Sequence, residues 1–151
     1  MKSVFIIAIV AVAMIGMMIP SAFAYTITDD ATGGDCSTIG TWDSASRTCT
    51  LSDDISEQIV IGANNIVLDG NGKTILGNPN QNYNEINYHD ANYYYCYDGE
   101  TAGIQLNAKT NIVIKNIVIK NWCHGILAQD SINNSFQENT IIENYWGIRL
   151  T

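Results

Sequence analysis

Charged side chains that could act in catalysis are spread thinly over the second half of the chain and its preceding turn. They are Asp69, Lys115, Lys120, Asp130, Glu138, Glu143 and Arg149. Hydrolysis of a glycosidic bond needs two carboxyl groups about 5 to 9.5 Å apart. A pectate-type lyase needs several carboxylates around Ca²⁺, with an Arg or Lys as base. The charged residues of this chain are not spaced to form either the carboxyl pair of a hydrolase or the carboxylate cluster of a lyase. Asp69 lies in an Asp-Gly-Asn-Gly turn, where its carboxylate is expected to bond the backbone. We assign no catalytic residue and lean against an enzyme, while a polysaccharide lyase or glycoside hydrolase stays open.

Four cysteines could form disulfides or bind a metal. They are Cys36, Cys49, Cys96 and Cys123. An even number of cysteines in an exported chain is typical of disulfides, and of the three pairings of two we favour Cys36–Cys49 and Cys96–Cys123. Thiolates beside His89 and His124 would suit Cu(I) or Zn²⁺, but no paired ligand spacing occurs. We therefore assign no metal or other cofactor, and Ca²⁺ or copper stays an unsupported alternative.

A cluster of aromatic residues is the best candidate for a binding surface. Six of the eight tyrosines fall in one segment, and Trp122 follows it in the sequence. The aromatic residues are Tyr83, Tyr88, Tyr93, Tyr94, Tyr95, Tyr97 and Trp122. Aromatic faces can stack on sugar rings while nearby Asn and Asp side chains bond the hydroxyls. The alternative is that the rings pack the segment against the rest of the domain.

A repeat must position these residues. Gly103, Gly125 and Gly147 each open a Gly-Ile-x-(Leu/Ala) run and recur every 22 residues. Between them lie short runs such as Asn-Ile-Val-Ile at 111–114 and 116–119. Runs of three or four β-branched residues are too short for helices and suit strands. The sequence therefore predicts an all-β, right-handed parallel β-helix of about three coils of ~22 residues, in which stacked coils bury a shared core.

The pattern also predicts which side chains point inward. We expect these to be Ile104, Leu106, Ile112, Ile114, Ile117, Ile119, Ile126, Phe136, Ile141 and Ile148. Asn side chains at equivalent corners should stack into ladders that bond one another and the turn backbone. Glycine at each strand start permits a bend that a side chain would crowd. Alignment of the final Asn residues places Lys120 beside Glu143 as an exposed ion pair.

The chain divides into four segments. Residues 1–24 carry Lys2, an apolar stretch and a small-residue site ending at Ala24, which predicts a cleaved signal peptide. Residues 25–58 should form an N-terminal cap with a local disulfide, and residues 59–151 the coils. An Asn- and Tyr-rich insertion at 78–102 interrupts the coils. The chain ends one strand into a coil, so we expect either a truncated version of a longer protein or an open edge that pairs with another chain.

The charge balance narrows the class of partner. After signal cleavage six basic and fifteen acidic residues remain, a net charge of −9. Such a surface repels nucleic acid. We therefore expect no nucleic-acid partner, no integral membrane protein after cleavage, and a glycan or cell-envelope partner for a secreted, periplasmic or cell-surface protein. Asn133-Asn134-Ser135 fits the glycosylation sequon, although a ladder position explains Asn133 or Asn134 equally well.

The repeat, together with the run from Asn65 to Ile75 (NIVLDGNGKTI), resembles the right-handed parallel β-helix proteins of the NosD type. These are periplasmic copper-binding proteins of nitrous-oxide reductase maturation. The chain also resembles the related carbohydrate-binding and sugar-hydrolase β-helix domains, which share a pectate-lyase-like fold. The resemblance covers about Leu51 to Thr151 without the insertion, and it implies fold more strongly than activity. The leading expectation is an exported, non-catalytic carbohydrate-binding module. The alternatives are a fragment of a lyase or hydrolase and a NosD-like copper maturation factor.

Overall fold

Short runs of β-branched residues between Asn and Gly form the strands of this protein. The computed structural model describes residues 24–78 and 101–151. These residues form three sheets and one short helix, α1 (Cys36–Ile39). Apart from one antiparallel pair, neighbouring strands in all three sheets run parallel. The protein is therefore mostly β with parallel sheets, as the sequence predicts.

Each sheet collects strands that lie far apart in the sequence. In spatial order, sheet A contains β1 (Tyr25–Ile27), β4 (Ile59–Ile61), β7 (Ala102–Asn107), β10 (His124–Gln129) and β13 (Trp146–Leu150). Sheet B contains β11 (Ser135–Gln137), β8 (Val113–Lys115), β5 (Val67–Asp69), β3 (Thr48–Leu51) and β2 (Gly40–Asp43). Sheet C contains β12 (Thr140–Ile142), β9 (Val118–Lys120) and β6 (Thr74–Leu76).

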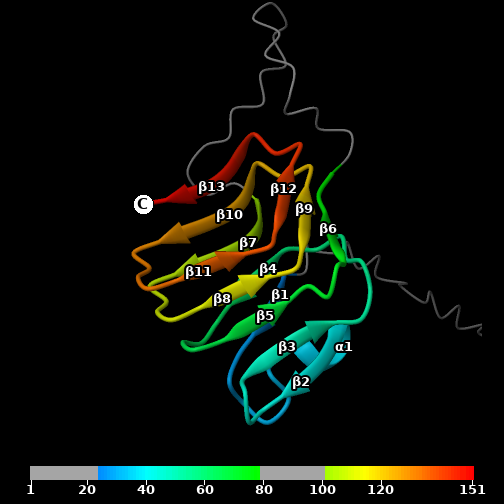
Figure 1. Ribbon diagram of the computed structural model, residues 1–151, viewed down its shortest axis with the longest axis vertical. Helices are drawn as coiled ribbons and strands as arrows, with labels where there is room; N and C mark the ends of the chain where they lie inside the picture. Colours follow the sequence, from blue (N-terminus) through cyan, green and yellow to red (C-terminus); the bar gives the residue numbers. More distant parts are fainter. Residues whose placement is uncertain (1–23, 79–100) are drawn as a thin grey trace, which may run out of the picture.

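The chain visits the three sheets in a fixed order, A then B then C, and we call one such passage a circuit. The strands β4, β5 and β6 make one circuit, β7, β8 and β9 the next, and β10, β11 and β12 the one after (Figure 1). Equivalent residues in the last circuits are 22 positions apart, as Ile104, Ile126 and Ile148 show by their pairing. The period read from the glycines is therefore confirmed.

The N-terminal segment covers the edge of the first predicted coil by pairing with it. β1 pairs with β4, β3 pairs with β5, and Ile55 forms a bridge to Ile75. β2 then adds an antiparallel strand outside β3. The Cys36–Cys49 disulfide joins α1 to β3 with a Cα–Cα distance of 5.7 Å, which confirms the predicted local bridge.

The core follows the predicted alternation of side chains. Seven of the ten expected inward residues are fully buried: Ile104, Leu106, Ile112, Ile114, Ile117, Ile119 and Ile126. Phe136 and Ile141 are half-buried and pack against this core. Ile148 lies on β13, the edge strand of sheet A, and stays 42% exposed. Ile148 pairs with buried Ile126, so it faces the predicted side of sheet A, but it is not buried there.

One predicted contact is wrong by a single residue. Lys120 pairs with Ile142, and the Glu143 carbonyl accepts a hydrogen bond from the Asn121 N–H at 3.1 Å. Alignment on Asn121 and Asn144 implied a spacing of 23 residues, whereas the paired strands from β7 onwards are 22 residues apart. Lys120 and Glu143 therefore do not occupy equivalent positions.

Two of the recurring glycines lie where a side chain would collide with the core of their own circuit. A Cβ at Gly103 would lie 2.6 Å from Ile119 Cγ2, and one at Gly125 would lie 2.6 Å from Ile141 Cγ2. Both distances are too short for real atoms, so neither position accepts a side chain without movement of the core. The predicted crowding is confirmed at Gly103 and Gly125 but not at Gly147, where the nearest atom, Ile141 Cγ2, is 3.9 Å from an added Cβ.

Two predicted segments lie largely outside the described residues. Residues 1–23 of the expected signal peptide lie outside them, as do residues 79–100 of the insertion. The insertion was predicted to end at 102, but Ala102 already belongs to β7. Among the described residues no helix is long and apolar enough to cross a membrane.

Candidate functional site

An open groove of about 470 Å³ lies on the outer surface at the turns between sheets B and C. Three consecutive circuits contribute to it, each through the residues that leave sheet B and enter sheet C. The lining residues are Asp69, Asn71, Gly72, Asn116, Ile117, Val118, Glu138 and Thr140. Amide, carboxylate and hydroxyl groups thus dominate its wall, with Val118 as a partly exposed apolar member.

The turns themselves explain why these residue types occur here. Asn71, Asn116 and Glu138 have φ values of 50°, 53° and 52°, in the left-handed region. Asn tolerates that region better than most residues because its short polar side chain can bond locally. Position 70 requires glycine for a different reason, which is lack of space for a side chain. A side chain there would collide with Ile117 Cβ of the next circuit, where the Gly70 N–H donates to the Lys115 carbonyl at 2.8 Å.

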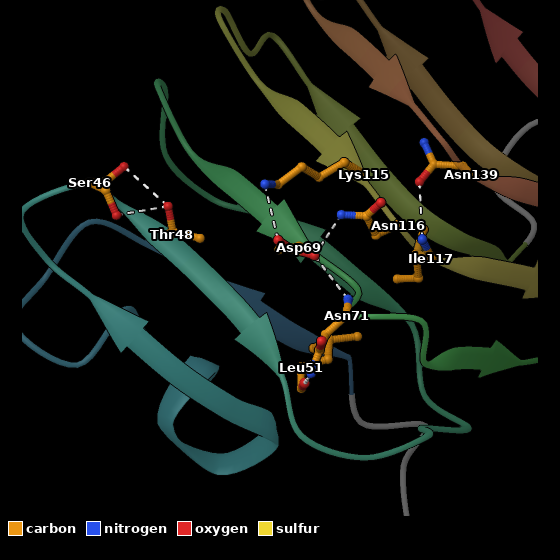
Figure 2. Close-up of polar contacts among 9 residues, drawn as sticks. All are labelled: Ser46, Thr48, Leu51, Asp69, Asn71, Lys115, Asn116, Ile117 and Asn139. Carbon is orange, nitrogen blue, oxygen red and sulfur yellow. Dashed lines mark hydrogen bonds and ion pairs between the residues drawn. The ribbon is translucent and has the colours of Figure 1, made fainter.

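Asp69 is one of the two charged residues that line the groove, and Figure 2 shows its polar contacts. Its Oδ2 lies 3.0 Å from Lys115 Nζ, and its Oδ1 accepts from the Asn71 N–H at 2.9 Å and from Asn116 Nδ2 at 3.3 Å. Burial opposes ionisation and raises the pKa. The bonds from Asn71, Lys115 and Asn116, with the Lys115 charge, outweigh it and leave the pKa of Asp69 below its usual value. This carboxylate is therefore held in its ionised form, and its oxygens already accept hydrogen bonds from neighbouring residues.

Asn side chains also bond the corners of one circuit to the circuit beside it. Asn139 Oδ1 accepts from the Ile117 N–H at 3.3 Å, and its Nδ2 donates to the Ile114 carbonyl at 2.9 Å. Asn144 repeats both bonds with Trp122 and Ile119 at 2.9 Å each. Stacked amides also occur, since Asn111 Nδ2 donates to Asn65 Oδ1 at 3.0 Å. The predicted Asn ladders are confirmed.

The groove is suited to hydrogen bonding rather than to acid catalysis. A general acid for glycoside cleavage needs a raised pKa, whereas that of Asp69 is lowered. Glu138 and Thr140 are exposed in the wall, so their polar atoms can reach a ligand. Neighbouring strands lie about 4.8 Å apart. The groove thus presents polar groups at regular steps along the stack of circuits.

The predicted aromatic surface is described only in part. Tyr83, Tyr88, Tyr93, Tyr94, Tyr95 and Tyr97 lie outside the described residues. Trp122 is only 6% exposed, and its Nε1–H donates to the Ile75 carbonyl at 3.2 Å. Its ring belongs to the core and offers little face to a sugar. Trp122 is therefore not a good ligand-binding residue, contrary to expectation.

The candidate metal ligands are also only partly described. His124 begins β10, is 1% exposed, and has Nε2 3.3 Å from Arg149 Nη1. His89 lies outside the described residues. Within residues 24–78 and 101–151, no group of three His, Cys, Asp or Glu side chains is placed to hold a metal ion.

The second disulfide keeps the status of a prediction. Cys123 is 1% exposed and disulfide-bonded. Cys96, its predicted partner, lies outside the described residues.

The C-terminal end of the stack exposes apolar side chains on the edge strands and the turns beside them. They are Ile132, Ile142, Tyr145, Trp146, Ile148 and Leu150, between 42% and 68% exposed. The two expectations for this edge, truncation of a longer protein and pairing with another chain, both stay predictions.

Sequence reasoning singled out Asp69 and Glu138 but missed Asn71, Asn116 and Thr140. A sequence signal existed for Asn116, which stands directly before the short β-branched run Ile117–Ile119. Comparisons with family models, with curated proteins and with solved structures find no match to this chain.

Proposed function

We propose that the three sheets form a right-handed parallel β-helix. The support is the fixed order of the sheets in successive circuits and the 22-residue offset between paired strands. About 98% of parallel crossover connections within a sheet are right-handed, which favours that hand. The resemblance of the repeat to NosD-type and carbohydrate-binding β-helix domains points the same way.

We propose further that the protein works outside the cytoplasm. A disulfide between Cys36 and Cys49 is typical of an oxidising compartment. The predicted signal peptide at 1–24 agrees with this proposal. Secretion, the periplasm and the cell surface all fit both observations.

We propose that its function is to bind carbohydrate without cleaving it. The observation that carries this proposal is the composition of the groove, in which hydroxyl-bonding side chains recur over three circuits. The Asp69 carboxylate is already bonded to Lys115, Asn71 and Asn116. It therefore positions its neighbours rather than donating a proton. The tyrosines of the insertion would add stacking faces.

The preferred ligand is a neutral, extended sugar chain that lies along the stack. Asn71, Asn116 and Glu138 come from consecutive circuits, so a linear polymer in that direction would meet a polar group at each strand spacing. The acidic surface disfavours a polyanionic sugar unless cations bridge the two.

Calorimetric titration with neutral oligosaccharides tests the groove. Thr140→Val removes one hydroxyl from the wall, and Glu138→Gln removes its exposed charge while keeping a polar group. We expect Thr140→Val to weaken binding several-fold, since a lost hydrogen bond is worth about 0.5–1.5 kcal/mol. The matched control is Thr41→Val, an exposed threonine on β2 at the opposite end of sheet B, which should bind as wild type.

The same titration separates the alternatives. Equal affinity of Thr140→Val and Thr41→Val for the sugar would mean that the groove is not the binding site. Oligosaccharide recovered in shortened form would instead support a lyase or hydrolase. Binding of copper without any sugar binding would support the copper maturation alternative.

A further inference from the structure

One exposed asparagine stands apart from the bonded asparagines of the corners. Asn133 lies in the turn between β10 and β11, with a φ of 57° and an exposed side chain. Its counterpart in the preceding circuit is Asn111, whose Nδ2 donates to Asn65 Oδ1. Asn134, the next residue, is half-buried and its Oδ1 accepts from the Ile112 N–H at 2.9 Å. The structure therefore assigns the ladder role to Asn134 and leaves Asn133 exposed at the surface.

Asn133 is also the acceptor position of an Asn-x-Ser sequon. Asn133-Asn134-Ser135 meets the sequence requirement for N-linked glycosylation, because the middle residue is not proline. Ser135 begins β11, which is the edge strand of sheet B. A glycan on Asn133 would therefore extend from a corner at the end of the stack without displacing a core side chain.

We propose that Asn133 is an N-glycosylation site of the exported protein. The co-reactant is a lipid-linked sugar phosphate supplied by the secretory pathway. Nδ2 of Asn133 forms a bond to the anomeric carbon of the sugar, and the bond from that carbon to the phosphate oxygen breaks. The amide loses one proton, and the lipid phosphate leaves with the electron pair of the broken bond.

The attached glycan would change the exposed end of the stack. Ile132, the residue before the acceptor, is 61% exposed. A hydrophilic glycan beside it would shield this side chain and add bulk next to the edge strand β11. Glycosylation at Asn133 would thus weaken any association of that end with another chain.

The test uses the full chain secreted from a eukaryotic host that glycosylates its exported proteins. Mass spectrometry should show a sugar-bearing peptide that contains Asn133, and peptide:N-glycosidase should convert that residue to Asp. Ser135→Ala should abolish the modification, and Ser135→Thr should keep it. Both substitutions leave the left-handed Asn133 in place, and the Ser135 hydroxyl bonds only Gln137 Nε2 among the described residues, at 2.8 Å.

The outcomes are decisive in either direction. Complete loss of the glycan in Ser135→Ala, with secretion at the wild-type level, supports the proposal. An unmodified Asn133 peptide from wild-type protein, while a control glycoprotein from the same cells is glycosylated, overturns it. A glycan found on any other residue but not on Asn133 overturns it as well.

Discussion

Asn139 joins two circuits through both ends of its amide, and its removal should destabilise the domain markedly. In Asn139→Ala the Ile117 N–H loses its side-chain acceptor and the Ile114 carbonyl loses one donor. A buried donor left without a partner costs roughly 1–3 kcal/mol, and loss of the second bond adds about 0.5–1.5 kcal/mol. We expect a loss of about 2–4 kcal/mol, a large part of the roughly 5–15 kcal/mol typical of a domain.

Urea unfolding followed by circular dichroism measures this loss. Asn134→Ala serves as the intermediate case, because Asn134 provides one bond, to the Ile112 N–H. Gln137→Ala is the control, because Gln137 is exposed and its side chain bonds its near neighbour Ser135. The expected order of destabilisation is Asn139, then Asn134, then Gln137. If Asn139→Ala unfolds at the same urea concentration as Gln137→Ala, the bridging role is refuted.

Three further predictions concern the core, the groove and the second disulfide. Ile114→Asp should abolish the β signal in circular dichroism, because a fully buried unpaired carboxylate costs several kcal/mol, whereas Lys120→Ala should be nearly silent. Asp69 has a lowered pKa in the folded state, so its stabilisation is present above the ordinary Asp pKa and is lost as the pH falls through the folded value. Asp69→Asn should therefore flatten the acid side of a stability–pH curve, and an unchanged slope would count against the bonds from Asn71, Lys115 and Asn116 that lower this pKa. Non-reducing peptide mapping should recover Cys96 linked to Cys123, and two free thiols would contradict that pairing.

The repeat could be predicted from the sequence because crowding and burial act on single positions. Gly103 and Gly125 must stay small, and Ile104 and Ile126 must stay apolar. Each of these two constraints therefore recurs in the sequence at the period of the repeat. The register of one corner could not be predicted. Asn144 sits one residue later in its turn than Asn121, because its side chain reaches back to the Trp122 N–H.

The residues that line the groove could not be predicted from the sequence, for a different reason. Asn71 and Asn116 come together only because circuits stack across the inserted segment, which hides their equivalence in a linear pattern. The burial of Trp122 was equally hidden. Its position beside a Tyr-rich segment suggested a ligand-binding ring, whereas the bond to the Ile75 carbonyl places it in the core.

Glycan-array binding by the full exported chain tests the proposed function most directly. Wild-type protein should bind neutral glycans, and added salt should barely change the affinity, because little charge attraction is present to be screened. Replacement of Tyr93, Tyr94 and Tyr95 together by Ala should weaken binding and leave the thermal midpoint little changed. No glycan bound by wild type, with a lowered midpoint in the triple variant, would contradict the account and assign those rings to packing.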